Sequence, residues 1–350
     1  MLNVFDVFKI ILGIIISIFI IFVVMRFVGS YMEIGESGRQ VSLMVNFKKT
    51  VENVYTTGIS TDFELKESEI LGYRPPMIET EVTFIDTSPT PVLLLPGKKL
   101  TVSRVDYDIG WWKFYMIEAL PESKIIFVPL NANGDTWSLV GNITKAMPST
   151  ENTETKIRFG VGCNGTEFRF GWEAYRFVEK ILPMIISGQM EFRACEDLAY
   201  FRKNGYTLVT ISEKDEDVEF LVKPSEGGVG HVYIKNGDEY QAYVYKNGMD
   251  IVSLLLGGQF FYDYTNDKFL RELDVAASIT SKEYNLLLND PEINRRCGNQ
   301  MNEFVALLGS IRETAAKLRS SDDENTALEF TGYMRDSAVK FREIESMGCA

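Results

Sequence analysis

The longest apolar stretch of the chain lies near its N-terminus. Residues 10–25 contain no charged side chain, and the flanking Lys9 and Arg26 can extend their charged groups toward lipid head groups. With two further apolar residues on each side the segment reaches about 22 residues, enough for a helix to cross about 30 Å of hydrocarbon. The alternatives are a buried core helix and a cleaved signal peptide, but residues 26–31 are a poor small-x-small cleavage site. The pattern predicts an uncleaved transmembrane anchor over residues 1–32.

Apolar residues continue at helical spacing beyond this anchor. Within residues 33–57 they form two groups with the spacings of three and four positions that are typical of a helix, namely Val41, Met44 and Val45, and Val51, Val54 and Tyr55. This predicts an amphipathic stalk helix that continues the anchor away from the membrane. Such a face packs against its own domain or pairs with the same helix of a neighbouring subunit, and the pattern leaves both arrangements open.

Residues 58–215 alternate between short apolar runs and helical periods, which predicts an α/β domain. The expected strands include 124–128, 156–159 and 190–195, and the expected helices include 111–120, 135–147 and 170–186. Strands that are separated by helices usually pair in parallel, with the helices covering the faces of the sheet. We therefore expect a layered domain with a parallel sheet.

Two further units are predicted toward the C-terminus. Asn236-Gly237 lies between two alternating runs and is a strong hairpin signal, so residues 216–290 are expected to form a small α+β subdomain. Residues 291–350 contain two amphipathic helical patterns on either side of the polar segment 320–325, which is rich in helix-capping residues. They predict a C-terminal helical hairpin. The expected fold class is α/β, in the mixed α+β sense, behind an N-terminal membrane helix.

The positions of the cysteines indicate the cellular compartment in which the chain folds. Cys297 and Cys349 are equidistant from residue 323 in the hairpin turn, so antiparallel helices bring the two thiols together at the open end. We predict a disulfide there, with two unrelated free thiols as the alternative. Cys163 and Cys195 are candidates for a second pair. Disulfides form in oxidising compartments, so this prediction places the chain after the anchor outside the cytoplasm.

Composition and charge exclude several function classes. The chain has 350 residues, of which 45% are hydrophobic and 24% charged, and this composition is typical of a folded protein. A formal net charge of −13 argues against a protein that binds nucleic acid by neutralising phosphates. Basic residues on the two sides of the anchor nearly balance, so charge does not decide the orientation of the anchor.

One motif has the form of a cofactor site. Gly160, Gly162 and Gly165 form a Gly-x-Gly-x-x-Gly pattern between a predicted strand and a predicted helix, which is the context of a dinucleotide fingerprint. The following helix opens with bulky residues, whereas a phosphate needs small residues and open amides at that point. A glycine-rich turn is therefore the preferred interpretation, and no cofactor is expected.

No catalytic or metal-binding constellation is expected elsewhere. His231 is the single histidine, and the chain has no Gly-x-Ser-x-Gly elbow. The oxygens of Asn131, Asn133 and Asp135 lack the distal glutamate of a calcium loop. These observations favour a protein that is not an enzyme.

The N-terminal arrangement resembles a known group of surface proteins. A very short N-terminus, one apolar anchor that continues into an amphipathic helix, and an acidic domain with cysteines look like the TadE-like and type IV pilin-like surface proteins of prokaryotes. The resemblance covers residues 1–57, and the segment from Asp6 to Ile10 lacks the cleavage site and glutamate of pilin precursors. It implies an envelope protein associated with secretion or pili, and it assigns no catalytic residue.

Two functions are therefore expected. The first is a single-pass, extracytoplasmic structural or adhesion protein that binds membrane lipid through its anchor and other proteins, or a second copy of itself, through its stalk. The second is an anchored enzyme or ligand receptor with a pocket near Gly160–Gly165. Neither expectation involves nucleic acid.

Overall fold

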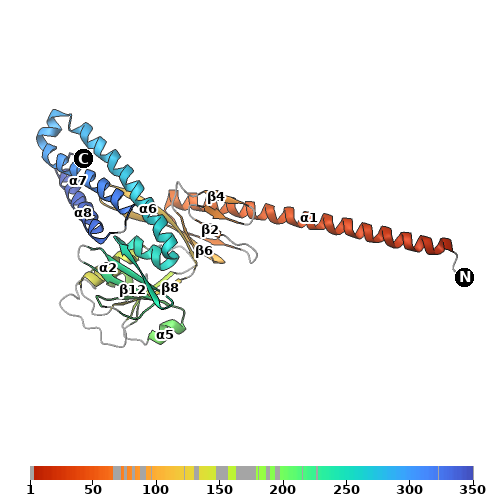
Figure 1. Cartoon of the computed structure of the whole chain (residues 1–350). Helices are drawn as coiled ribbons and strands as arrows, with labels where there is room; N and C mark the ends of the chain where they lie inside the picture. Colours follow the sequence, from red (N-terminus) through yellow and green to blue (C-terminus); the bar gives the residue numbers. More distant parts are fainter. Residues whose placement is uncertain are drawn as a thin grey trace.

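The computed structural model describes residues 4–65, 72–74, 77–80, 83–86, 92–95, 97–121, 123–129, 134–146, 157–162, 179, 181–186, 190–193, 198–214, 216–225, 228–321 and 323–349. Figure 1 shows a long helix that leads into a body with two further parts, an α/β layer and a group of helices near the C-terminus. This arrangement is of the mixed α and β class that the sequence predicts.

Helix α1 (Val4–Thr57) is one continuous helix of 54 residues. At 1.5 Å per residue it is about 80 Å long. Its N-terminal part projects away from the body, and its C-terminal part lies against a sheet (Figure 1). The backbone of the predicted anchor therefore runs into that of the predicted stalk without a break.

The first sheet has the strand order β1 (Thr61–Glu64), β6 (Lys99–Asp108), β7 (Lys113–Pro121) and β5 (Val92–Leu94). Only β5 and β7 pair in parallel among these strands. A separate antiparallel sheet consists of β2 (Gly72–Arg74), β3 (Met77–Glu79) and β4 (Phe84–Asp86). The C-terminal part of α1 covers one face of the first sheet, and the two elements share a core that includes Leu43, Met44, Phe47, Val51, Val54, Leu100, Val102 and Ile117.

The second sheet has seven strands in the order β10, β9, β8, β11, β12, β13 and β14. Their bounds are Met190–Arg193, Ile157–Gly162, Ser123–Pro129, Thr207–Ile211, Phe220–Pro224, Gly230–Asn236 and Glu239–Tyr245. The pairs from β10 to β12 are parallel, and β13 and β14 are antiparallel. The predicted parallel pairing is confirmed for the described strands, and so is the hairpin, in which Gly237 has a φ of 67°.

Helices cover this second sheet and extend beyond it. Helix α2 (Gly134–Lys145) and the first part of α6 (Gly248–Leu287) share a core with the sheet residues Phe127, Val209 and Val232. Helix α6 is interrupted at Gly258, whose φ of 68° and ψ of −165° lie outside helical values. The short helices α4 (Leu182–Ile186) and α5 (Leu198–Lys203) also belong to this region.

The C-terminal helices α7 (Pro291–Leu318) and α8 (Glu324–Ser346) form the predicted helical hairpin. They pack against the second part of α6, and their common core includes Phe304, Leu308 and Phe330. The first sheet joins this core through Trp111, whose indole N–H donates to Ser337 Oγ at 2.9 Å. The hairpin is therefore fixed to both the α6 helix and the β6–β7 turn.

Two sequence predictions differ from this fold. Residues 111–120 were expected to be helical, but they fall largely in β7. Both faces of β7 are buried, so its apolar residues do not alternate with polar ones and periodicity cannot distinguish them from a buried helix. The predicted boundary between 58–215 and 216–290 lies inside the seven-stranded sheet, while β1 and β5–β7 form a sheet of their own. Helix 170–186 lies mostly outside the described residues.

Candidate functional site

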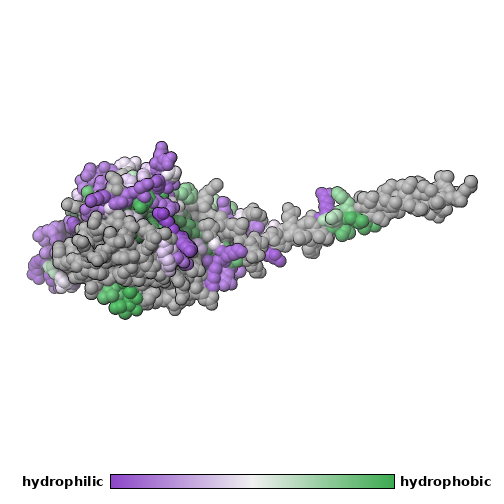
Figure 2. All heavy atoms as spheres, turned by 90° about the horizontal axis from the view of Figure 1, so that it is seen from below, coloured by the Kyte–Doolittle hydropathy of each residue, from purple (hydrophilic) through white to green (hydrophobic). Residues whose placement is uncertain are grey.

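The projecting part of α1 exposes apolar side chains on all of its sides. Residues 20–25 are consecutive apolar residues, and their exposed fractions range from 47% for Val23 to 70% for Met25. At 3.6 residues per turn, six consecutive positions surround the helix completely. Figure 2 shows this segment as a green band on the projecting helix, away from the body. A helix that is apolar on every side requires an apolar environment.

The rest of the predicted anchor is described only in part. The backbone of residues 4–19 is helical, but their side chains lie outside the described set. Within the part of the chain that is described in full, no helix combines the length and the hydropathy needed to cross a membrane.

The stalk has two distinct faces. One face, which includes Met44 and Phe47, is buried against the first sheet. On another face Val41 and Val45, one helical turn apart, are 45% and 46% exposed. At the end of the helix, Arg104 donates to the carbonyl oxygen of Tyr55 at 2.8 Å. Three residues of the predicted apolar stripe, Met44, Val51 and Val54, therefore pack within their own domain, whereas the other three, Val41, Val45 and Tyr55, remain exposed.

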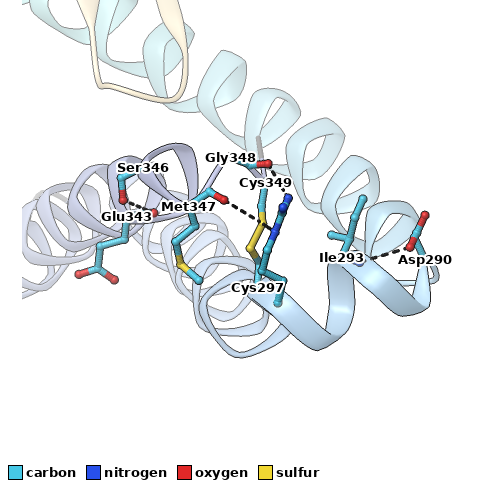
Figure 3. The surroundings of a disulfide bond; sticks show 9 residues. Asp290, Ile293, Cys297, Glu343, Ser346, Met347, Gly348 and Cys349 are labelled. Carbon is cyan, nitrogen blue, oxygen red and sulfur yellow. Dashed lines mark hydrogen bonds between the residues drawn. A yellow bond between two sulfur atoms is a disulfide. The ribbon is translucent and has the colours of Figure 1, made fainter.

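A disulfide closes the C-terminal hairpin at its open end. Cys297 lies in the second turn of α7 and Cys349 follows α8, and their Cα atoms are 6.5 Å apart. Both residues are buried, and Arg296 donates to Cys349 Sγ at 3.1 Å and to the carbonyl oxygen of Gly348 at 2.7 Å. Figure 3 shows the bond between the two chain segments. This pairing agrees with the prediction from the symmetry of the hairpin.

Local sequence explains why the two cysteines meet. Asp290 caps the N-terminus of α7 by accepting from the backbone N–H groups of Glu292 and Ile293, and Asp323 caps α8 by accepting from Thr326. The backbone hydrogen bonds to Asp323 hold the pKa of its carboxyl below the usual value. These caps fix the residue at which each helix begins, and the cap at Asp323 also ends the turn that follows α7.

The glycine motif is only partly described. Gly160 and Gly162 lie inside β9, where Gly160 pairs with Ile126 of β8 and Glu191 of β10. A dinucleotide fingerprint places its glycines in the turn after the strand, so these two positions do not fit that geometry. Gly165 lies outside the described residues, as do Cys163 and Cys195.

The remaining candidates do not converge on a reactive centre. His231 lies in β13, and its Nε2 is 4.0 Å from Oε2 of Glu324 at the start of α8. Asn131 and Asn133 lie outside the described residues. Among the residues that are described, no three His, Cys, Asp or Glu side chains are grouped so that they could hold a metal ion.

Sequence reasoning missed a buried acid in the first sheet. Glu118 of β7 is fully buried, and neither of its carboxylate oxygens has a hydrogen-bond partner among the described residues. Its neighbour across the strand pair, Ser103, has a buried hydroxyl that likewise finds no hydrogen-bond partner in the part of the chain that the structure describes. Burial raises the pKa of Glu118 well above the usual value. Its position between apolar residues in the sequence is the signal that could have identified it.

Comparisons of the chain with protein-family models, with curated proteins and with solved structures gave no match. The resemblance of residues 1–57 to pilin-like surface proteins therefore stays a prediction.

Proposed function

We propose that this chain is a single-pass membrane protein whose body lies outside the cytoplasm and makes protein contacts, as a structural, adhesion or secretion-associated component. The observation that carries the proposal is the band of apolar residues 20–25, exposed on every side of a helix that stands clear of the body. In water such a band is unfavourable, at roughly 25 cal/mol for each Å² of apolar surface. A bilayer removes this cost.

The disulfide supports the proposed side of the membrane. The Cys297–Cys349 bond is typical of proteins from oxidising compartments and is rare in the cytoplasm. Gln40 is the first residue of the stalk that is buried among the side chains described, and it follows Met25, the last residue of the apolar band 20–25, by 15 positions. At 1.5 Å per residue this places the body about 22 Å from the end of the apolar band.

The anchor is tested with charged substitutions at the centre of the apolar stretch. The full-length double variant Ile14→Asp/Ile18→Asp is expected to leave the membrane fraction in a flotation gradient, because each aspartate at the centre of a membrane helix costs about 3 kcal/mol. The matched control is Val41→Asp/Val45→Asp, which has the same spacing on the same helix but lies outside the apolar stretch. It should float with the membranes, as the unaltered chain does.

A second experiment determines on which side of the membrane the body lies. A cysteine placed at Ser320, in the exposed hairpin turn, should react with a membrane-impermeant maleimide on intact cells. Labelling only after permeabilisation, or flotation of the Ile14→Asp/Ile18→Asp variant with the membranes, contradicts the proposal.

The protein contact that we propose is self-association through the stalk. Val41 and Val45 are exposed one turn apart on a helix whose other apolar face is already covered, so a second copy can bury them in a helix pair. Cross-linking of the full chain in its membrane should yield a dimer, and Val41→Asp/Val45→Asp should reduce the yield at least about tenfold because it buries like charges at the contact. An exposed control pair, Lys48→Asp/Glu52→Lys, should have no such effect. An equal yield from both variants contradicts the proposed contact.

A further inference from the structure

A cavity of about 600 Å³ lies where the parts of the body meet. It is lined by the end of β6, by α2, by the turn between β14 and α6, and by the first half of α8. This volume is in the range of sites that hold small molecules, roughly 300–1,000 Å³. The apolar band, the exposed stalk valines and the disulfide do not line it, so it is independent of the function proposed above. We name it the junction cavity.

Two tyrosines give the junction cavity hydrogen-bond donors. Tyr107 and Tyr245 both line it, and neither hydroxyl has a hydrogen-bond partner among the described residues. Tyr245 is only 1% exposed. Its ring lies over Gly230, where a Cβ atom would come within 2.7 Å of the hydroxyl oxygen. Burial raises the pKa of both phenols, so both stay protonated and can donate. An acceptor group of a ligand in the cavity can therefore accept from these hydroxyls.

Two further donors belong to the same lining. The side-chain oxygen of Asn247 accepts from the backbone N–H of Asp250 at 3.0 Å, which leaves its amide nitrogen available. Arg335 lies on the solvent side, with its side chain 70% exposed and its nearest ion-pair partner, Asp336, 3.7 Å away. With the two tyrosines, these residues give four side chains of the lining that can donate, of which Arg335 is charged. A second cation of the lining, Lys246, is 3.4 Å from the carboxylate of Asp250.

The acidic groups of the cavity are already paired. Asp106 accepts from Arg104 at 2.7 Å, and the carboxylate of Asp108 is 3.2 Å from Lys113. Asp108 also accepts from the backbone N–H of Gly110, which holds its pKa below the usual value. Because both carboxylates are held in ion pairs at the cavity, they repel a ligand with two negative charges, and a single negative charge is the best match for Arg335.

Part of the lining is apolar. Leu139 of α2 and Ala146, which follows α2, line the cavity together with Phe330 and Met334 of α8, beside the polar side chains of Asn142 and Thr331. An apolar wall of this kind favours a ligand with a hydrophobic body, because contact with it removes apolar surface from water.

We propose that the junction cavity binds a small organic monocarboxylate with an apolar body. The carboxylate accepts hydrogen bonds from Tyr107, Tyr245, Asn247 and Arg335, and the apolar body contacts Phe330 and Met334. Since α2, α6 and α8 each contribute residues, an occupied cavity also holds the hairpin against the α/β layer.

The probe for this proposal is 3-phenylpropionate, titrated by calorimetry into the full chain in lipid nanodiscs. The matched neutral compound is 3-phenylpropanol, which has the same body without the charge. The acid is expected to bind at least about tenfold more tightly than the alcohol, since a charged hydrogen bond is worth more than a neutral one. Arg335→Met should weaken binding of the acid about tenfold or more, and Tyr245→Phe about threefold to tenfold.

A second arginine of α8 provides the control. Arg342 lies outside the lining and donates to the carbonyl oxygen of Ala338, so Arg342→Met should bind the acid as the unaltered chain does. Three results overturn the proposal. The first is no heat of binding from the acid up to about 10 mM. The second is equal binding of the acid and the alcohol, which indicates partition into lipid, and the third is an equal loss of affinity for the acid in the two arginine variants.

Discussion

The double variant Cys297→Ala/Cys349→Ala is expected to lose about 4 kcal/mol of unfolding free energy in the part of the chain that contains the hairpin. The bond joins residues 52 positions apart, and in the chain-entropy model a loop of that length restricts the unfolded chain by this amount. Alanine is chosen because Cys297 is fully buried, where a serine hydroxyl would lack a partner.

This loss is measured from the urea dependence of unfolding, with hydrogen exchange of the α7 and α8 backbone amides as the readout. Exchange should accelerate in both helices and in the second part of α6, because these three helices share one core. The unaltered chain after reduction with dithiothreitol provides the control, since it loses the bond but keeps both side chains. A loss below about 1 kcal/mol in both samples would show that packing alone holds the hairpin.

Replacement of Glu118 is expected to change how stability depends on pH. The folded chain keeps the Glu118 carboxyl protonated above its ordinary pKa of 4.5, because burial raises the pKa, whereas the unfolded chain releases this proton. The free energy of unfolding therefore falls as pH rises above about 4.5, by up to about 1.4 kcal/mol per pH unit, until the folded pKa is reached. Between pH 5 and pH 7 the fall reaches up to about 3 kcal/mol.

Glu118→Gln removes this contribution while it keeps the size and shape of the side chain. The variant should be more stable than the unaltered chain at pH 7, and the difference should shrink toward pH 5, in urea denaturation at several pH values. Glu239→Gln is the control, because Glu239 also lies in a strand but is exposed. A difference that does not depend on pH would mean that Glu118 is ionised in the folded chain.

Much of the local structure follows from the sequence. The helix pattern of residues 33–57, the Asn236-Gly237 hairpin and the two C-terminal helices all appear where the sequence predicts them. Each depends on contacts between residues close in the chain, namely caps, turns and periodic apolar faces. The cysteine pairing followed from the same local reasoning, because two helices of matched length bring their ends together.

The sheet boundaries did not follow from the sequence. Strand β7 has buried residues on both faces, so its pattern is equally compatible with a buried helix. The strands after residue 216 extend the sheet that begins with β8, although acidic loop residues separate them in the chain. Pairing between strands that are distant in the sequence depends on which sheet edges are free in the folded protein. The pattern of apolar and polar residues along the sequence does not show which edges these are.

The sequence by itself determined the apolar N-terminal helix, the hairpin and its cysteine pair, because each needs only the periodicity and spacing of neighbouring residues. Only the tertiary structure decided which stalk residues stay exposed, that Glu118 is buried without a hydrogen-bond partner among the described residues, and that Tyr107, Tyr245 and Arg335 line one cavity. These properties depend on burial and on distances between segments that lie far apart in the chain, as Tyr107 and Arg335 do, and both are set by packing rather than by local pattern.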